Sequence, residues 1–206
     1  MNKKLLFILL LAFAGLANAL EPKAGEEYDR IEPAPPVGTG DQVDVLEFFM
    51  YTCPHCNHLE PSLEAWRKNL PANVHFQPVP AMFGGVANLH AKTYFALQAI
   101  GEADRLHEAF FKEIHEKKNR LGNRQAIEKF LADQGVDLDK FRQAFDSFAV
   151  QTKANRAAAL MRRYGVRAVP TLVVDGRYRV KNGPQVLQVT DALIQRTLQE
   201  RKQKDH

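Results

Sequence analysis

The stretch that decides the fold is VDVLEFFMYTCPHC, residues 43–56. Its first eight residues are apolar apart from Asp44 and Glu47, and they are rich in β-branched and aromatic side chains, which is typical of a buried strand. A helix is predicted to begin directly afterwards. Cys53 stands at the cap position, and Pro54 suits the first helical position, where its missing N–H group costs nothing. The sequence therefore predicts a strand-to-helix junction at residues 53–56.

Cys53 and Cys56 are the only two cysteines of the chain. Thiols three residues apart on the first turn of a helix lie on the same side and close a disulfide with little backbone movement. An inert structural disulfide is the alternative, but it would close too short a loop to constrain the unfolded chain much. We therefore predict a redox pair. Cys53 should have a pKa well below that of a free thiol, because it faces the unpaired N–H groups of the helix start and the positive end of the helix dipole, and because His55 can add a hydrogen bond or a positive charge.

Other uses of two nearby cysteines fit the sequence less well. A c-type haem site requires a histidine directly after the second cysteine, and Asn57 stands there. Zinc would require two further ligands, and a second Cys-x-x-Cys is missing, so that His58 or His90 could serve only by accident of folding. We expect no metal and no cofactor other than the redox-active disulfide itself.

The rest of the chain predicts an α/β sheet interrupted by helices. A second strand is expected at residues 74–79, and sheet character returns at residues 168–174 with a hairpin to Tyr178-Arg179-Val180. A final helix is expected at residues 191–201, with Thr190 as its cap. Residues 21–40 are rich in proline and glycine and predict an irregular lead-in. Strand, helix, strand is the opening of an α/β sheet, so we predict one sheet domain with an insertion.

The predicted insertion is a block of helices between residues 84 and 164. Gly101, Gly135 and Gly165 stand where helices are expected to end. Apolar residues recur at helical spacing and are predicted to form the core of the block: Leu106, Ala109, Phe110, Ile114, Ile127, Phe130, Leu131, Phe141, Ala144, Phe145, Phe148, Ala157, Leu160, Met161 and Tyr164. We place the domain boundaries at residues 20–83 and 152–206 for the sheet domain and at residues 84–151 for the helical domain.

The first residues predict export. Lys3 and Lys4 precede an apolar run at residues 5–17, and Ala17-Asn18-Ala19 is a small-x-small cleavage site. The run is short of the roughly 20 residues of a membrane span, so a signal peptide removed after Ala19 is favoured over an uncleaved anchor. Export leads to an oxidising compartment, where a cysteine pair can rest as a disulfide. The bacterial style of the signal indicates a periplasm.

The charge balance argues against a nucleic-acid partner. Removal of Lys3 and Lys4 lowers the formal charge from +4 to +2, and no basic patch with interleaved aromatic residues is present. The basic tail at residues 201–204 is expected to be a solvated helix end.

At this point the chain resembles the DsbA-type thiol:disulfide oxidoreductases of the thioredoxin fold. The resemblance rests on Leu46-Glu47-Phe48-Phe49 ahead of Cys53-Pro54-His55-Cys56, on Phe83-Gly84-Gly85 at the start of the helical block, on Val169-Pro170-Thr171, and on Pro61 within the first helix. It implies a thioredoxin fold with an inserted helical domain. It also implies a monomer that oxidises unfolded or partly folded exported proteins with free thiols and is reoxidised by a DsbB-type membrane quinone reductase.

The resemblance also assigns roles to single residues. It implies that Pro170 follows a cis peptide bond beside the cysteine pair, against the reading of an ordinary trans edge-strand proline. Val169 and Thr171 would then present backbone groups to an extended substrate chain. Glu47 would lie buried beneath the cysteines and pass protons to Cys56. The alternative is that Glu47 is an edge or outward-facing residue. The lysine that often accompanies this glutamate is replaced by Gln77 at the matching position.

Two rival functions remain open in the sequence. One is a disulfide reductase or isomerase on the same fold, although residues 20–40 are too few for the dimerisation domain that such isomerases usually carry. The other is a chaperone that retains the cysteine pair incidentally. Five histidines form no recognisable constellation and are expected to be scattered surface or structural residues: His75, His90, His107, His115 and His206.

Overall fold

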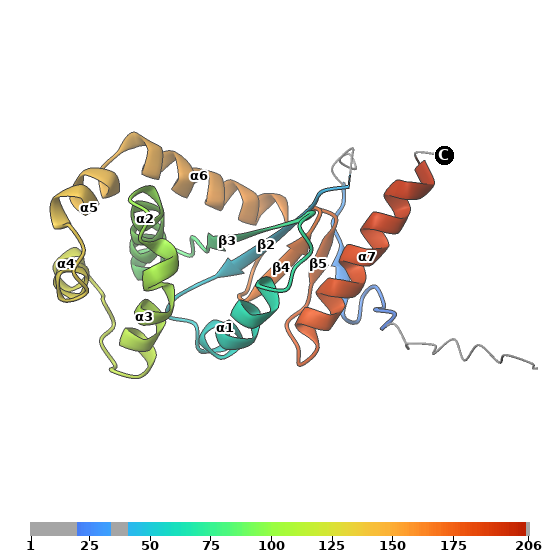
Figure 1. The fold of residues 1–206 in the computed structure, drawn as a ribbon, viewed down its shortest axis with the longest axis horizontal. Coiled ribbons are helices and arrows are strands. Elements are labelled where there is room, and N and C mark those ends of the chain that lie inside the picture. The colour runs from blue at the N-terminus through green and yellow to red at the C-terminus, as the bar shows by residue number, and fades with distance from the viewer. Residues whose placement is uncertain (1–19, 34–40, 205–206) are drawn as a thin grey trace, which may run out of the picture.

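The computed structural model describes residues 20–33 and 41–204 of the 206-residue chain. The predicted signal peptide, residues 1–19, and His206 lie outside the described residues. A five-stranded sheet stands at one end of the molecule and a group of helices at the other (Figure 1).

The sheet has the strand order β1-β5-β4-β2-β3. Its strands are β1 (Tyr28–Arg30), β2 (Val43–Phe49), β3 (Val74–Pro80), β4 (Thr171–Val174) and β5 (Tyr178–Val180). Only β2 and β3 run parallel, with Leu46 beside Gln77 and Glu47 beside Pro78; the other pairs are antiparallel. β2 is an interior strand of the sheet, between β3 and β4. The residues that follow it therefore begin beside the ends of both neighbouring strands.

Three helices cover the sheet. The first, α1 (Pro54–Arg67), and the last, α7 (Val186–Lys204), lie on one face, where Leu63 and Val189 pack into one core cluster with Val45. The longest helix of the inserted block, α6 (Phe148–Arg163), returns along the other face, where Met161 packs with Phe48. The first two strands of the α/β unit and its active-site helix therefore form as the sequence predicts.

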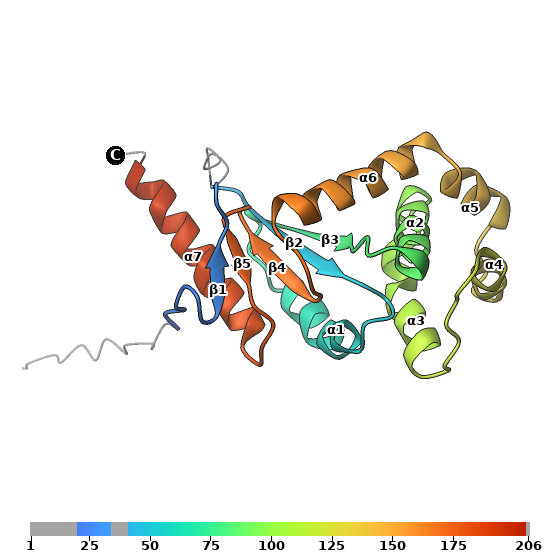
Figure 2. The same cartoon turned by 180° about the vertical axis from the view of Figure 1, so that it is seen from behind.

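The inserted block consists of α2 (Gly85–Ala99), α3 (Ala103–His115), α4 (Arg124–Asp133), α5 (Leu138–Phe145) and α6. The view from behind shows α6 running from the far end of this block back to the sheet (Figure 2). The predicted boundary between residues 151 and 152 falls inside α6, so one continuous helix belongs to both parts. Gly101, Gly135 and Gly165 follow helix ends with φ values of +78°, +75° and +61°, which confirms their predicted places.

Three expectations from the sequence were wrong. Residues 28–30 are not irregular but form β1, an edge strand too short to show a periodic pattern. The last helix begins at Val186 rather than near Asp191, because Val186 and Val189 are buried against the sheet. Thr190 is therefore inside the helix, where its hydroxyl donates to the carbonyl of Val186 instead of capping.

Phe148 does not belong to the core. Its side chain is 86% exposed, whereas Phe141 and Phe145 are buried. The apolar spacing of α5 stops at the break between helices, where Ser147 caps α6 by accepting from the amide of Val150, and Phe148 is the first residue of the new helix. The helical spacing of the apolar residues therefore does not continue from α5 into α6, and the sequence does not mark clearly where one helix ends and the next begins.

Candidate active site

The predicted junction is present, with Cys53 as the N-cap of α1 and Pro54 at the helix start. The amide of Cys56 donates to the sulfur of Cys53 over 3.4 Å, and the thiol of Cys53 faces the carbonyl oxygen of Val169 at the same distance. Both cysteines are buried, and their thiols are unbonded to each other in this structure. A sulfur acceptor at the cap position satisfies one of the N–H groups that a helix start leaves without an intrahelical partner.

The two thiols have opposite acidities. The pKa of Cys53 is lowered to about 6, first by a hydrogen bond from the Cys56 thiol, against burial, and then by the backbone N–H groups of Cys56 and His55 and the charge of His55. The pKa of Cys56 is raised far above its ordinary value by the same hydrogen bond, by burial and by the charges of Cys53 and Glu47. The predicted low pKa of Cys53 is thus supported. Its first cause is the partner thiol, which the sequence analysis did not consider.

The Val169–Pro170 peptide bond is cis, as predicted, and the loop lies against the cysteine pair. Val169 is half-buried, and its carbonyl faces Cys53. Thr171 begins β4, is buried, and donates through its hydroxyl to the carbonyl of Ala168. The loop therefore brings the three predicted substrate-contact residues to the cysteine site.

Glu47 is buried, with 1% of its surface exposed. Burial raises its pKa well above the ordinary value, the neighbouring carboxylate of Glu60 raises it further, and the charge of Arg67 opposes both. Its Oε1 atom is buried without a hydrogen-bond partner among the described residues. The outward-facing alternative is excluded, and a carboxyl group of raised pKa lies within electrostatic reach of Cys56.

Gln77 does not take up a position beside Glu47. In the β2–β3 register Gln77 is the neighbour of Leu46. Side chains alternate between the faces of a strand, so Gln77 and Glu47 point to opposite sides of the sheet. Gln77 lines a hollow with Arg156 and Leu160 of α6, while Glu47 faces α1.

Four further residues, which the sequence does not single out for this role, join the site: Glu60, His107, Tyr51 and His115. Glu60 lies on α1, and its Oε1 is 3.4 Å from Nε2 of His107 on α3. Nδ1 of His107 is 2.9 Å from the hydroxyl of Tyr51, two residues before Cys53. The backbone carbonyl of Tyr51 accepts from Nε2 of His115 at 2.8 Å. His107 and His115 therefore both contact Tyr51, which fits the structural one of the two roles expected for them.

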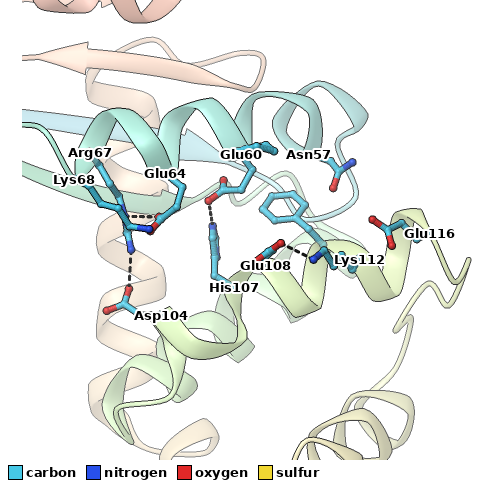
Figure 3. Close-up of a pocket in the computed structure, with 12 residues that line it drawn as sticks. Asn57, Glu60, Glu64, Arg67, Lys68, Asp104, His107, Glu108, Lys112 and Glu116 are labelled. Carbon is cyan, nitrogen blue, oxygen red and sulfur yellow. Dashed lines mark ion pairs between the residues drawn. The ribbon is translucent and has the colours of Figure 1, made fainter.

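Helices α1 and α3 form the walls of a groove of about 350 Å³ (Figure 3). Glu60 and His107 point toward each other across it, and both are mostly buried, with 12% and 13% of their side chains exposed. Charged residues from both helices line the rest: Glu64, Arg67, Lys68, Asp104, Glu108, Lys112 and Glu116. Glu60, whose charge raises the pKa of Glu47, therefore borders this groove.

A second hollow, of about 360 Å³, lies on the other side of the helix start. His55 and His58 of α1 border it, opposite residues 182–188 at the start of α7. This hollow is next to the reactive end of α1.

The described residues contain no cluster of three or more His, Cys, Asp or Glu side chains arranged for a metal. Within residues 20–33 and 41–204, no helix combines the length and apolar character needed to cross a membrane.

The family profile described as DSBA-like thioredoxin domain matches residues 44–200. The chain is 36% identical over 203 residues to the thiol:disulfide interchange protein DsbA of Pseudomonas aeruginosa, with 94% of this chain and 96% of that protein covered. The DsbA of Burkholderia cepacia is 42% identical over 188 residues, with 88% of each chain covered.

Solved structures agree with the fold. The crystal structure of Pseudomonas aeruginosa DsbA matches with a TM-score of 0.81 at 36% identity and covers 90% of this chain and 97% of its own. The oxidoreductase DsbA from Xylella fastidiosa gives 0.79 at 35% identity, over 85% and 97%. The cysteine pair at a helix start, the cis-proline loop beside it and these matches together show that the chain belongs to the DsbA family of thioredoxin-fold thiol:disulfide oxidoreductases.

Proposed function

We propose that this protein donates a Cys53–Cys56 disulfide to pairs of thiols in exported proteins. The observation that carries the proposal is the unequal acidity of the two cysteines, with the pKa of Cys53 lowered to about 6 and that of Cys56 raised. A stabilised thiolate favours the reduced form, so the disulfide is a strong oxidant.

The reaction proceeds in two exchanges. A substrate thiolate attacks the sulfur of Cys53, the bond between Cys53 and Cys56 breaks, and a mixed disulfide forms while Cys56 leaves as a thiolate and takes up one proton. The second substrate thiol loses its proton to solvent and attacks the substrate sulfur of the mixed disulfide. Cys53 then leaves as the stable thiolate. The substrate loses two electrons and two protons, and the protein gains two electrons and one proton, which Cys56 holds.

Glu47 is the proposed source of the proton for Cys56. Cys56 is buried, so bulk water does not reach its sulfur directly. Burial raises the pKa of the Glu47 carboxyl, so this group keeps its proton to a higher pH than an exposed glutamate and can give it to a stronger base. Glu47 therefore protonates Cys56 when the disulfide opens, and takes the proton back when the protein is reoxidised.

The cis-proline loop is the proposed contact for the substrate backbone. Val169, Pro170 and Thr171 lie beside Cys53, and an extended chain can pair with free backbone groups at such an edge. Backbone pairing carries no sequence preference, which suits an oxidase of many unfolded proteins. The hollow beside His55 gives room for residues that flank the reacting cysteine.

We place the protein in the periplasm, with a DsbB-type membrane quinone reductase as the oxidant that restores the disulfide. The signal peptide predicted from the sequence supports this compartment, and so does membership of the DsbA family, which acts in the periplasm. A bacterial periplasm is kept oxidising by such a quinone-linked route rather than by a thiol buffer.

The equilibrium of the cysteine pair with glutathione buffers tests the direction of the reaction. If the pair becomes reduced in a buffer that leaves thioredoxin oxidised, the protein is poised to donate disulfides. A potential as low as that of thioredoxin would instead assign reduction or isomerisation. That result would also replace the quinone reductase by a membrane electron donor.

Two variants separate the oxidase from a chaperone. Cys56→Ala is expected to trap mixed disulfides when its Cys53 thiolate attacks a disulfide-bonded substrate, because the second thiol of the pair, which would release the substrate, is absent. Cys53→Ser should abolish substrate oxidation. A Cys53→Ser variant that prevents aggregation as well as the wild type, together with a wild type that oxidises no substrate, would favour the chaperone.

Reoxidation is tested with membranes that contain a DsbB-type enzyme and quinone. The reduced wild-type protein should regain its disulfide there and drive repeated substrate oxidation, whereas membranes without the enzyme should not. Equal turnover in both preparations would contradict the proposed partner.

A further inference from the structure

The inserted helical block contacts the buried acid Glu60 of α1 through His107 of α3. We propose that His107 is the solvent-side member of a proton relay that runs through Glu60 and Glu47 to Cys56. The inference rests on the proposed function of the cysteine pair and adds to it the source of the proton. His107 does not touch the reacting sulfurs; it acts through the two carboxyl groups.

The inner part of the relay is set by α1 and β2. Glu60 follows Cys56 by four residues, so both side chains lie on the same face of α1. The charge of Glu60 raises the pKa of Glu47, and the charge of Glu47 raises that of Cys56, so the three groups are electrostatic neighbours in this order. Glu60 Oε2 and Glu47 Oε1 are buried without hydrogen-bond partners in the described part of the chain. Each of the two neighbouring acids therefore keeps one buried oxygen without a donor, and their mutual repulsion favours the protonated form of Glu47.

The outer part is held by Tyr51. Burial, followed by the charges of Tyr94, Glu60 and Glu47, raises the pKa of the Tyr51 hydroxyl well above its ordinary value, so the group stays protonated. It lies 2.9 Å from Nδ1 of His107, which leaves Nε2 directed at Oε1 of Glu60, 3.4 Å away. His115, two helical turns further along α3, donates a hydrogen bond to the backbone carbonyl of Tyr51 at 2.8 Å and so holds Tyr51 in place. The imidazole ring is therefore oriented toward the acid and not toward solvent alone.

The groove between α1 and α3 supplies water to the ring. Its volume of about 350 Å³ holds several water molecules, since one occupies about 30 Å³ in the liquid. The ionisable groups around His107 come from every neighbouring element: Glu60, Glu64, Arg67 and Lys68 from α1, Asp104, Glu108, Lys112 and Glu116 from α3, Tyr94 from α2, and Tyr51 from the loop after β2. In the part of the chain that the structure describes, the imidazole makes polar contacts with Glu60 and Tyr51.

The proton count closes for each substrate exchange. The imidazolium of His107 gives its Nε2 proton to Glu60, Glu60 passes one to Glu47, and Glu47 protonates the sulfur of Cys56 as the disulfide opens. Neutral His107 then takes a proton from water in the groove. Reoxidation runs the same transfers in reverse, so the relay consumes nothing.

The test is the pH dependence of the reduction of the oxidised protein by dithiothreitol, followed by acid quench, alkylation and mass spectrometry. Rates from about pH 5 to about pH 8 are divided by the thiolate fraction of the reagent, because histidine titrates within this range. The wild-type rate should fall as the pH rises across this range. His107→Ala should remove this pH dependence and lower the rate about 100-fold at about pH 6, the lower end of general acid catalysis.

Imidazole separates a relay from a structural role. Added imidazole should enter the space left in His107→Ala and restore the rate, whereas it should leave the wild type unchanged. His75→Ala is the matched control: His75 is also paired with a carboxylate, Asp44, but it is exposed and should give the wild-type profile with no imidazole effect. His107→Gln keeps the size and the N–H donor without the titration, so it should fold and share the flat profile if His107→Ala proves unstable.

The outcomes are distinguishable from those of the proposed function. A folded His107→Gln with the wild-type pH profile would overturn the relay, even if the wild type is a good oxidase. A folded His107→Ala without rescue by imidazole would do the same. A wild type that fails to oxidise substrates, with a potential as low as that of thioredoxin, would overturn the oxidase but leave the reduction profile as a valid measure of the relay.

Discussion

The amide nitrogen of Cys56 lies 3.4 Å from the sulfur of Cys53, so the second cysteine helps to hold the charge of the first. The Cys56 thiol adds a hydrogen bond of its own, which is the largest cause of the lowered pKa of Cys53. The same bond opposes ionisation of Cys56. The thiol contact therefore makes Cys53 the better leaving group and Cys56 the partner that holds the proton.

The titration of Cys53 should show this dependence directly. In the reduced protein, the ultraviolet absorbance of the thiolate should appear with a midpoint at about pH 6. Cys56→Ala should move the midpoint upward more than His55→Ala, because the partner thiol contributes more than the charge of His55. A larger shift in the His55 variant would show that the imidazole dominates instead.

The reduced protein should be more stable than its Cys53→Ala variant, by an amount that depends on pH. The pKa of Cys53 is lowered in the folded protein, so its contribution is complete only above the unfolded pKa and is lost as the pH falls through about 6. At about pH 7 the contribution should be about 1 kcal/mol, since one unit of pKa is worth about 1.4 kcal/mol. Urea unfolding of both reduced proteins at about pH 7 and about pH 5 measures the loss. An equal difference at both values would contradict the lowered pKa.

Glu47→Gln should stabilise the protein while slowing its chemistry. The folded pKa of Glu47 is raised, so its presence costs stability as the pH rises above the unfolded value. The variant should gain stability at about pH 7, and the gain should shrink as the pH falls toward about 4.5, the ordinary value for a glutamate. Thermal unfolding and the rate of reduction by dithiothreitol give the two measurements. Glu26→Gln, at a side chain that is 66% exposed, is the control and should change neither.

Two phenylalanines of the helical block should differ strongly in their contribution to stability. Phe141→Ala removes a fully buried ring and should cost about 3–5 kcal/mol. Phe148→Ala removes a ring that is 86% exposed and should stay within about 0.5 kcal/mol of the wild type. Urea denaturation compares them, and similar losses would show that Phe148 is covered in solution.

Local patterns explain why much of the fold could be predicted. An apolar run predicts β2, and Pro54 predicts the start of α1. Glycines with positive φ mark the ends of several helices. β1 could not be found in this way. It has three residues, and its formation depends on β5, far along the chain. Phe148 misled the prediction for a related reason, since periodicity alone does not show where one helix ends and the next begins.

The residues of the site also differ in whether local sequence patterns predict them. Cys53, Cys56 and Pro170 stand in short motifs that carry their geometry with them. Glu60 was accessible from the sequence too, because it follows Cys56 by four residues on a predicted helix. His107 was not, since its approach to Glu60 depends on the packing of α3 against α1, two elements separated by β3 and α2.

The position of β2 between β3 and β4 has a consequence for how the protein is made. β2 and β3 emerge early during synthesis, but β4, the other neighbour of β2, emerges only after the whole helical block. Contacts between such distant segments form slowly, because a long loop must close first. The cysteines therefore leave the ribosome well before the cis-proline loop that lies against them in the folded protein. During that interval the nascent chain carries two thiols that its own fold does not yet cover.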